Sequence, residues 1–188
     1  MDAVLAELLE FVVWIDHRIV ELTLAVRTPL LTEAMTSVTG LGSATAALVF
    51  LGICYLAGWT DELRSATLAL ALAGVVVGTM MWTIQRPFPP GPVCVTGGAE
   101  TVTSSLPSGH AAAGAIYAMT ARRSSVLPFG AVAVLAVAIA VSRIYLGTHY
   151  FSDTLVGVGI GVGTFALAVW LHERLDLDAV VAQYRSRQ

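Results

Sequence analysis

The chain has 188 residues, the length of one domain, and 56% of them are apolar while 12% are charged. The net charge of −3 is mild, and no basic patch with interleaved aromatic residues is present, so the sequence argues against a nucleic-acid partner. The mean hydropathy is +0.78. Five long stretches carry no charged side chain, namely 34–60, 65–85, 101–121, 124–142 and 154–171, and His110 is the single histidine within them. Each is about as long as a bilayer-spanning helix, so the sequence predicts an integral membrane protein.

The first apolar segment differs from the others. Residues 3–26 place apolar side chains at helical spacing, with acids and bases on the other face. This pattern predicts an amphipathic helix that lies in the membrane interface and ends before Pro29, while a further span remains the alternative. The charged residues and the lack of a basic start argue against a cleavable signal peptide.

The remaining segments predict an all-α, polytopic membrane bundle of five or six transmembrane helices. We expect five spans at about 34–58, 65–85, 107–121, 125–143 and 151–171. We treat 1–188 as a single domain, with an interfacial helix over 1–28, a transmembrane core over 34–172 and a cytoplasmic tail over 173–188.

Residues 86–106 separate the second and third spans and contain four prolines and three glycines, which predicts a loop. Pro107 suits the first turn of the helix that follows, because its missing N–H has no partner there. Gly157, Gly159, Gly161 and Gly163 in the last span predict a close approach of another helix.

The arginines are distributed unevenly over the two predicted membrane faces. One face carries six, namely Arg64, Arg122, Arg123, Arg174, Arg185 and Arg187, and the other carries Arg18, Arg27, Arg86 and Arg143. Cytoplasmic segments are enriched in arginine and lysine. We therefore expect a multi-pass cell-membrane protein whose C-terminus is cytoplasmic and whose histidine-rich face is extracytoplasmic.

Ionisable residues interrupt the apolar segments between 107 and 153. Apart from Arg122 and Arg123, which end the third predicted span, they are His110, Arg143, His149 and Asp153. Such residues are costly at membrane depth, so their default interpretation is functional. Together they provide a base-backed nucleophile, a proton donor and anion-binding groups, which are the components of phosphoryl transfer.

His149 and Asp153 are four positions apart, so on a helix they would share one face. The Asp153 carboxylate would then accept a hydrogen bond from one ring nitrogen of His149 and leave the other free to attack. The alternative is a membrane histidine that is merely satisfied by a neighbouring acid.

Ser108, Gly109 and His110 lie where the third helix is expected to begin. Free N–H groups at a helix start, together with the helix dipole, bind anions, and His110 could protonate a leaving oxygen. A simple helix-capping turn is the alternative. Arg86 and Arg143 offer planar forks that match phosphate oxygens, although Arg86 could instead anchor the chain at the interface.

Three ordered motifs resemble those of the type-2 phosphatidic acid phosphatase superfamily. They are Arg86-Pro87, then Pro107-Ser108-Gly109-His110, then Ser142-Arg143 followed by His149 and Asp153. The resemblance implies that His149 is the nucleophile that forms a phosphohistidine, with Asp153 as its orienter and His110 as the general acid.

The resemblance also implies that Arg86, Arg143, Ser108 and Gly109 hold the phosphate and that neither a metal nor a cofactor is needed. The substrates expected from it are membrane lipids with a phosphate or diphosphate, such as phosphatidate, phosphatidylglycerol phosphate or polyprenyl diphosphate.

One position departs from the family pattern. The first motif usually begins with a lysine seven positions before its arginine, and here that position is Thr79. Seven positions are about two helical turns, so we expect Thr79 to share a helical face with Arg86 and to bind the phosphate through its hydroxyl, without a positive charge. A non-catalytic lipid-phosphate binder or transporter is therefore one alternative, and a vanadate-dependent haloperoxidase-like enzyme is another, although five apolar spans argue against a soluble oxidase.

Overall fold

The computed structural model describes residues 2–93 and 104–175, and the described part of the chain is entirely α-helical apart from turns and loops. Its helices are α1 (Asp2–Ala25), α2 (Pro29–Gly40), α3 (Ala44–Leu56), α4 (Thr60–Ile84), α5 (Gly109–Arg123), α6 (Phe129–Tyr145) and α7 (Phe151–Leu175). The predicted all-α class is confirmed. The middle of the predicted loop and nearly all of the predicted cytoplasmic tail lie outside the described residues.

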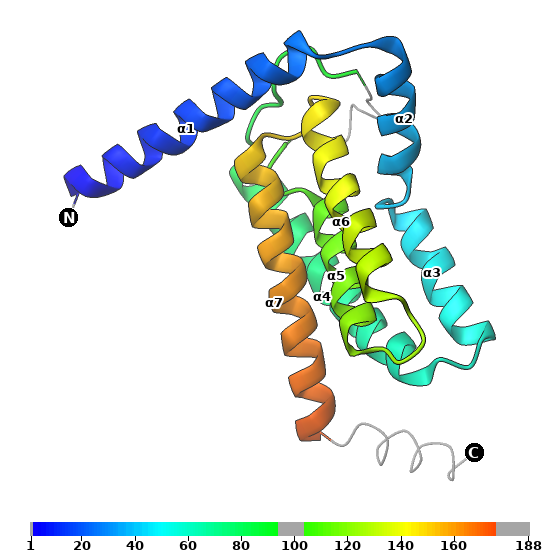
Figure 1. The fold of residues 1–188 in the computed structure, drawn as a ribbon. Coiled ribbons are helices and arrows are strands. Elements are labelled where there is room, and N and C mark those ends of the chain that lie inside the picture. Colours follow the sequence, from blue (N-terminus) through cyan, green and yellow to red (C-terminus); the bar gives the residue numbers. More distant parts are fainter. Residues whose placement is uncertain (1, 94–103, 176–188) are drawn as a thin grey trace.

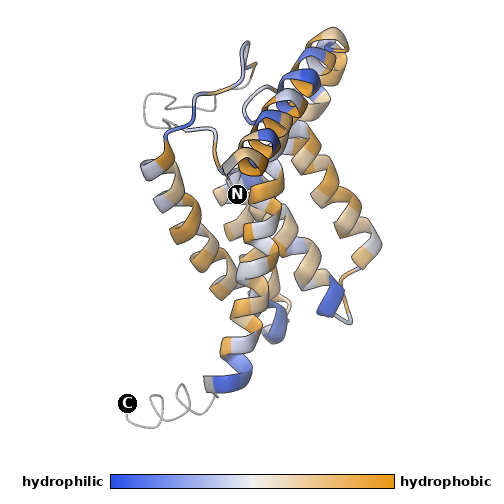
Figure 2. Ribbon diagram, turned by 90° about the vertical axis from the view of Figure 1, so that its left-hand side faces the viewer, coloured by the Kyte–Doolittle hydropathy of each residue, from blue (hydrophilic) through white to orange (hydrophobic). Residues whose placement is uncertain are grey.

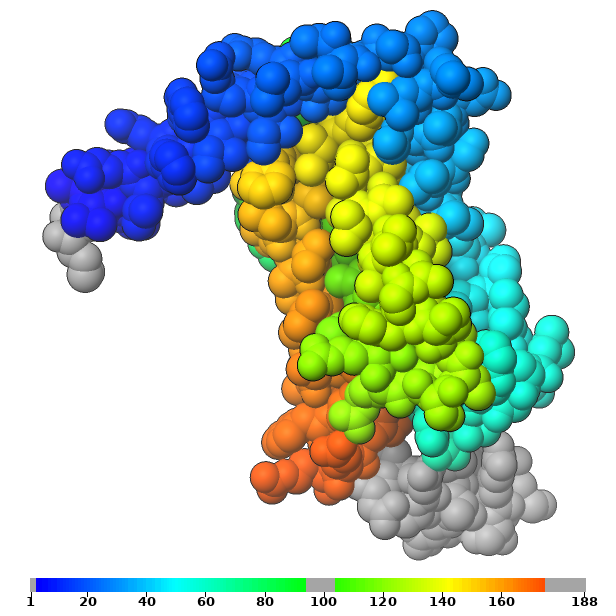
Figure 3. Space-filling model, viewed as in Figure 1, coloured from blue at the N-terminus to red at the C-terminus, as the bar shows by residue number. Residues whose placement is uncertain are grey.

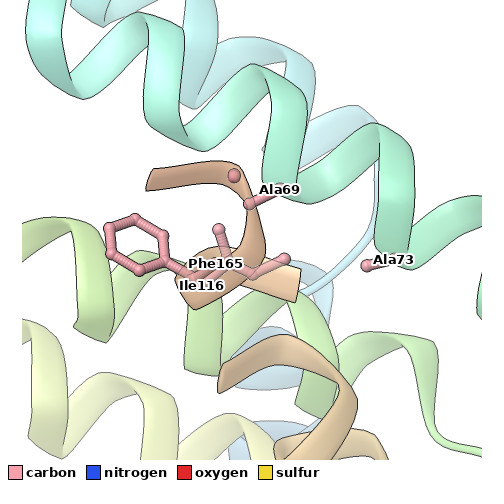
Figure 4. Close-up of a cluster of buried hydrophobic side chains, with 5 residues drawn as sticks. Ala69, Ala73, Ile116 and Phe165 are labelled. Carbon is pink, nitrogen blue, oxygen red and sulfur yellow. The ribbon is translucent and has the colours of Figure 1, made fainter. Parts of the chain in front are cut away.

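Helix α5 lies at the centre of the bundle and packs against α4, α6 and α7 (Figure 1). Most of its side chains are buried and small, so its neighbours approach closely. A core cluster joins α4, α5 and α7 through Ala69, Ala73, Ile116, Phe165 and Ala168 (Figure 4).

Two glycines of α7 set its distance from α5. A methyl group added at Gly157 would collide with the carbonyl oxygen of Ser108, and one at Gly161 would collide with that of Ala112. These glycines are four residues apart and so face the same way. Gly159 and Gly163 have open space around them, so two of the four predicted packing glycines do contact a helix.

The segment predicted as one span over 34–58 is two helices. α2 and α3 meet at a bend of 52°. Ser43 begins α3 by accepting a hydrogen bond from the backbone N–H of Ala46 at 3.2 Å. Gly42 fills the bend, where a methyl group would lie 2.7 Å from a methyl carbon of Ile139 and 3.0 Å from Cβ of His110. Close packing against α5 and α6 therefore depends on this glycine.

Helix α1 crosses the end of the bundle at which α6 ends and α7 begins, and its N-terminal half projects beyond it (Figures 1 and 3). It ends at Ala25, before Pro29 as predicted, and Pro29 is the first residue of α2. Large apolar side chains, including Leu5, Leu9 and Trp14, are exposed along its projecting half. The interfacial position of α1 stays a prediction.

The helices of the bundle are mostly hydrophobic along their length, and hydrophilic residues gather at the ends of the bundle and along α1 (Figure 2). Many of the large apolar side chains on these helices are exposed. Helices α4 and α7 are each long and apolar enough to cross a membrane, with hydropathies of 1.9 and 2.0. In the described residues the bent pair α2–α3 meets the same criterion as one span, and α6 is shorter. The predicted polytopic membrane bundle agrees with this arrangement, although length and hydropathy alone support fewer than the five or six expected spans.

Candidate active site

Three regions that are separated in the sequence meet at the end of the bundle crossed by α1 (Figure 1). They are the chain after α4, the start of α5, and the continuous stretch from the end of α6 to the first turn of α7. These segments carry Arg86, Ser108 to His110, Arg143, and His149 with Asp153. The predicted motifs therefore lie at one end of the bundle.

His149 lies in the short connection between α6 and α7 and is 5% exposed. Its Nδ1 forms a short hydrogen bond with the backbone carbonyl of Ser105. A carbonyl can only accept, so Nδ1 carries the proton and Nε2 has its lone pair free. Burial, followed by the positive charge of Arg143, lowers the pKa of His149 to about 3 and so favours the neutral ring.

The predicted hydrogen bond between His149 and Asp153 is wrong. It assumed a continuous helix, but α7 begins at Phe151, so His149 precedes it. Asp153 lies in the first turn of α7, and its carboxylate accepts the N–H of Tyr150 at 2.8 Å. A carboxylate here satisfies a helix-start N–H and complements the helix dipole. Its other oxygen accepts a bond from Arg86 at 2.5 Å.

Ser108 caps the start of α5, and its hydroxyl accepts the N–H of Ala111 at 3.4 Å. The N–H of Ser108 donates to the backbone carbonyl of Asp153 at 3.1 Å, which joins α5 to α7. The helix begins at Gly109, so Pro107 precedes the cap instead of lying in the first turn as predicted. The N–H groups of Gly109 and His110 lie at the open start of the helix, where an anion would bind.

Arg143 lies on the last turn of α6 and is buried. Its Nη1 donates to the hydroxyl of Thr39 at 2.9 Å, and its carbonyl accepts the N–H of Thr148 and of His149. The bond from the N–H of His149, at 3.3 Å, holds the backbone of His149 against the end of α6 that carries Arg143. Nothing in the sequence singles out Thr39, because its contact with Arg143 spans 104 positions.

Arg86 is held by two carboxylates. Its Nη2 donates to Asp16 at 2.8 Å, and its Nη1 donates to Asp153 and, at 2.8 Å, to the hydroxyl of Ser152. The Tyr150 ring centroid is 4.2 Å from its guanidinium carbon. Burial works to lower the pKa of Arg86, but the two carboxylates outweigh burial and raise it, so the cation is stabilised.

Asp16 was not singled out by the sequence, since it is one of several acids in the amphipathic segment. The loop after Arg86 is held by Arg27, which follows α1 and whose contacts the sequence did not indicate either. Its guanidinium donates to the carbonyls of Gly91 and Tyr145, each at 2.8 Å. The Tyr145 carbonyl lies at the end of α6, where a cation is favoured by the helix dipole.

Thr79 does not share a helical face with Arg86, contrary to the prediction. α4 ends at Ile84, and the chain then turns through Gln85, which has a φ of 48°. Thr79 is exposed. A methyl group added at Gly109 would lie 3.5 Å from a methyl carbon of Val77, so Val77 faces the start of α5. Thr79 comes two residues later in α4 and is therefore rotated by about 200° from Val77 around the helix. The Thr79 side chain therefore leaves α4 on the side opposite the start of α5.

An apolar groove of about 360 Å³ lies between α6 and α7, with α5 as its floor. Ala111, Ala115 and Met119 form the floor, while Val141 and Leu155 are among the side chains of the walls. The groove begins beside the candidate site and follows the helices toward the opposite end of the bundle. In the described residues there is no cluster of three or more His, Cys, Asp and Glu side chains placed to hold a metal ion.

Comparisons with known proteins identify the fold and the family of this chain. The fold is similar to the crystal structure of Aquifex aeolicus LpxE, with a TM-score of 0.68 and 22% identity over 81% of this chain and 93% of that one. It is also similar to a transmembrane PAP2-type phosphatidylglycerolphosphate phosphatase from Bacillus subtilis, with a TM-score of 0.69 and 25% identity over 93% and 88%. A comparison with curated protein sequences finds no match. The model of the PAP2 superfamily matches residues 62–176, so the chain belongs to that superfamily.

Proposed function

We propose that this protein is a membrane phosphatase that removes phosphate from lipid phosphates or diphosphates through a phosphohistidine at His149. The observation that carries the proposal is the bond from Nδ1 of His149 to the Ser105 carbonyl. This bond leaves Nε2 as a neutral nucleophile beside the positive charge of Arg143. A neutral nitrogen nucleophile next to a cation suits attack on an anionic phosphoryl group.

The reaction has two steps. The Nε2 lone pair attacks phosphorus, the bond from phosphorus to the lipid oxygen breaks, and protonated His110 gives its proton to that oxygen. Water then attacks the phosphohistidine, the bond from nitrogen to phosphorus breaks, and His110 takes the proton of the water. The N–H groups that begin α5 and the guanidinium of Arg143 bind the phosphoryl oxygens.

Three observations support a lipid substrate. The chain belongs to the PAP2 superfamily, and the Bacillus subtilis relative is a phosphatidylglycerolphosphate phosphatase. The apolar groove between α6 and α7 begins beside the site and suits a hydrocarbon chain. Phosphatidate, phosphatidylglycerol phosphate and polyprenyl diphosphate are the candidates, and all share an anionic phosphate joined to an apolar tail.

The decisive assay measures inorganic phosphate released from those three lipids in detergent micelles, together with a water-soluble phosphomonoester. We expect release from at least one lipid. Saturable lipid binding without release would support a binder or transporter instead. Vanadate-dependent halide oxidation, followed by a colour assay, would support the haloperoxidase-like alternative.

We also propose that the site faces outward and that the tail after α7 is cytoplasmic, on the basis of the arginine distribution. The exposed residues Pro90 and Ser125 lie toward opposite ends of the bundle. In a Cys94→Ala background, Pro90→Cys should react with an impermeant thiol reagent in intact cells, whereas Ser125→Cys should react only after permeabilisation. The reverse pattern would contradict the proposed orientation.

A further inference from the structure

Asp16 is a buried carboxylate on a helix that is otherwise mostly exposed. It is 1% exposed, whereas the large apolar side chains on the half of α1 that projects beyond the bundle (Figure 3) are exposed. A buried carboxylate is costly unless it is paired and hydrogen-bonded. Its location is where α1 crosses the first turn of α7, directly beside the candidate site.

The Asp16 carboxylate is fully engaged there. Oδ2 accepts bonds from Nη2 of Arg86 at 2.8 Å and from the hydroxyl of Ser152 at 2.5 Å. Oδ1 accepts the backbone N–H of Ser152 at 2.9 Å. Because Ser152 is the second residue of α7, Asp16 also places a negative charge at a helix start, where it is favoured.

The position of Arg86 depends on this carboxylate. Asp16 holds Nη2, while Asp153 and the Ser152 hydroxyl hold Nη1. A guanidinium has five N–H donors, and the described contacts use three. Two donors remain for a phosphate oxygen, and the bonds to α1 and α7 fix the direction in which they point.

We propose that Asp16 is the positioning residue for Arg86. Helix α1 then contributes to phosphate binding by orienting the Arg86 guanidinium, in addition to any role in the membrane interface. The inference rests on the proposed function, in which Arg86 binds the substrate phosphate. Removing the charge of Asp16 frees Nη2 and lets the guanidinium turn toward Asp153. Phosphate then binds to a guanidinium that is no longer oriented for it.

The test compares Asp16→Asn with Glu21→Gln in the full-length protein. The protein is held in detergent micelles, and the substrate is a water-soluble phosphomonoester. Glu21 lies on the same helix, is exposed, and pairs with exposed Arg18, so it controls for loss of one carboxylate from α1. Asp16→Asn should raise KM about tenfold, about 1.4 kcal/mol, and change kcat much less. Asp16→Glu, which keeps the charge, should recover part of the loss, and Glu21→Gln should match the wild type.

A double-mutant cycle separates positioning from general stability. In an Arg86→Lys background, Asp16→Asn should raise KM no further, because the geometry that it maintains is already lost. If Asp16→Asn does not fold, Ser152→Ala removes the hydroxyl that bridges Asp16 and Arg86 and should raise KM in the same direction. An unchanged or lower KM in the folded variants, or independent effects in the cycle, would overturn the inference.

Thermal stabilisation by inorganic phosphate tests the role of Asp16 independently of the proposed function. A wild-type protein that hydrolyses no phosphate ester would contradict the function alone. Phosphate binding can still be compared, because a ligand raises Tm according to its affinity. Asp16→Asn should then need about tenfold more inorganic phosphate for the same shift, and an equal requirement would overturn the role of Asp16.

Discussion

His149 is joined to Ser105, a residue 44 positions earlier in the chain, by a hydrogen bond from its Nδ1 to the backbone carbonyl. No side-chain substitution can remove that acceptor. Its position depends on the segment between α4 and α5, because the N–H of Ser105 donates to the carbonyl of Arg86 at 2.8 Å and its hydroxyl to that of Pro87 at 3.1 Å. The segment that carries Arg86 therefore also orients His149, the proposed nucleophile.

The first prediction concerns His149. His149→Ala should abolish phosphate release, because no other group supplies the attacking nitrogen. EDTA should leave the wild-type rate unchanged, since the proposed reaction uses no metal. His172→Ala is the matched control, because His172 lies at the opposite end of α7, and it should retain activity. Reversible inhibition by EDTA, or turnover by folded His149→Ala, would contradict the mechanism.

The second prediction concerns Asp153→Asn. Where a carboxylate fixes the tautomer of a catalytic histidine, replacing that aspartate by asparagine lowers kcat about 10⁴-fold. Here the Ser105 carbonyl does so, and the amide introduced by the substitution could still accept the N–H of Tyr150 through its side-chain oxygen. We therefore expect a loss well below 10⁴-fold, accompanied by a higher KM because Arg86 loses a charged acceptor. A loss of about 10⁴-fold in kcat with KM unchanged would show that Asp153 orients His149 during turnover.

The third prediction tests the apolar groove. Ala115→Phe places a bulky ring on its floor and should reduce kcat/KM for long-chain lipid phosphates, by about tenfold or more, while a water-soluble phosphomonoester is hydrolysed as before. The control is Ala71→Phe on α4, where the side chain is exposed and outside the groove. Equal losses for both kinds of substrate would show that Ala115→Phe disturbs the helices and not a tail-binding groove.

The sequence predicted the helices and the end of the bundle at which the motifs meet. Apolar runs and the polar turns between them were sufficient, because successive spans return the chain to alternate membrane faces. The cap at Ser108 was foreseen only as an alternative, because the predicted helix began at Pro107 and the observed one begins at Gly109. The sequence could not locate the break between α2 and α3, because an apolar run defines a span by length, and the bend at Gly42 depends on packing against His110 and Ile139.

The partners of the charged residues were less predictable. Asp16 and Ser152 are 136 positions apart, and only the tertiary fold brings them together. The helical spacing of His149 and Asp153 was misleading for a local reason, since one lies before the start of α7 and the other inside its first turn. Spacing predicts a shared face only where the helix is continuous.

The fourth prediction concerns Thr79, where related sequences are expected to carry a lysine. From the sequence alone, Thr79→Lys should add a charge-assisted bond to phosphate and raise kcat/KM about tenfold. The structure revises that expectation, because Thr79 is exposed and leaves α4 on the side away from the start of α5. We now expect kcat/KM to stay within about threefold of the wild type.

Stability should also change little in Thr79→Lys. Thr79 is five residues, or about 7.5 Å, from the end of α4 at Ile84, and a long lysine side chain can extend its charge along an apolar surface to water. Measuring Tm and kcat/KM together decides between the two expectations. A tenfold gain in kcat/KM with Tm unchanged would mean that the lysine reaches the phosphate around α4, and that the first motif extends to Thr79 after all. A fall in both would mean instead that the hydroxyl of Thr79 supports the local structure of α4.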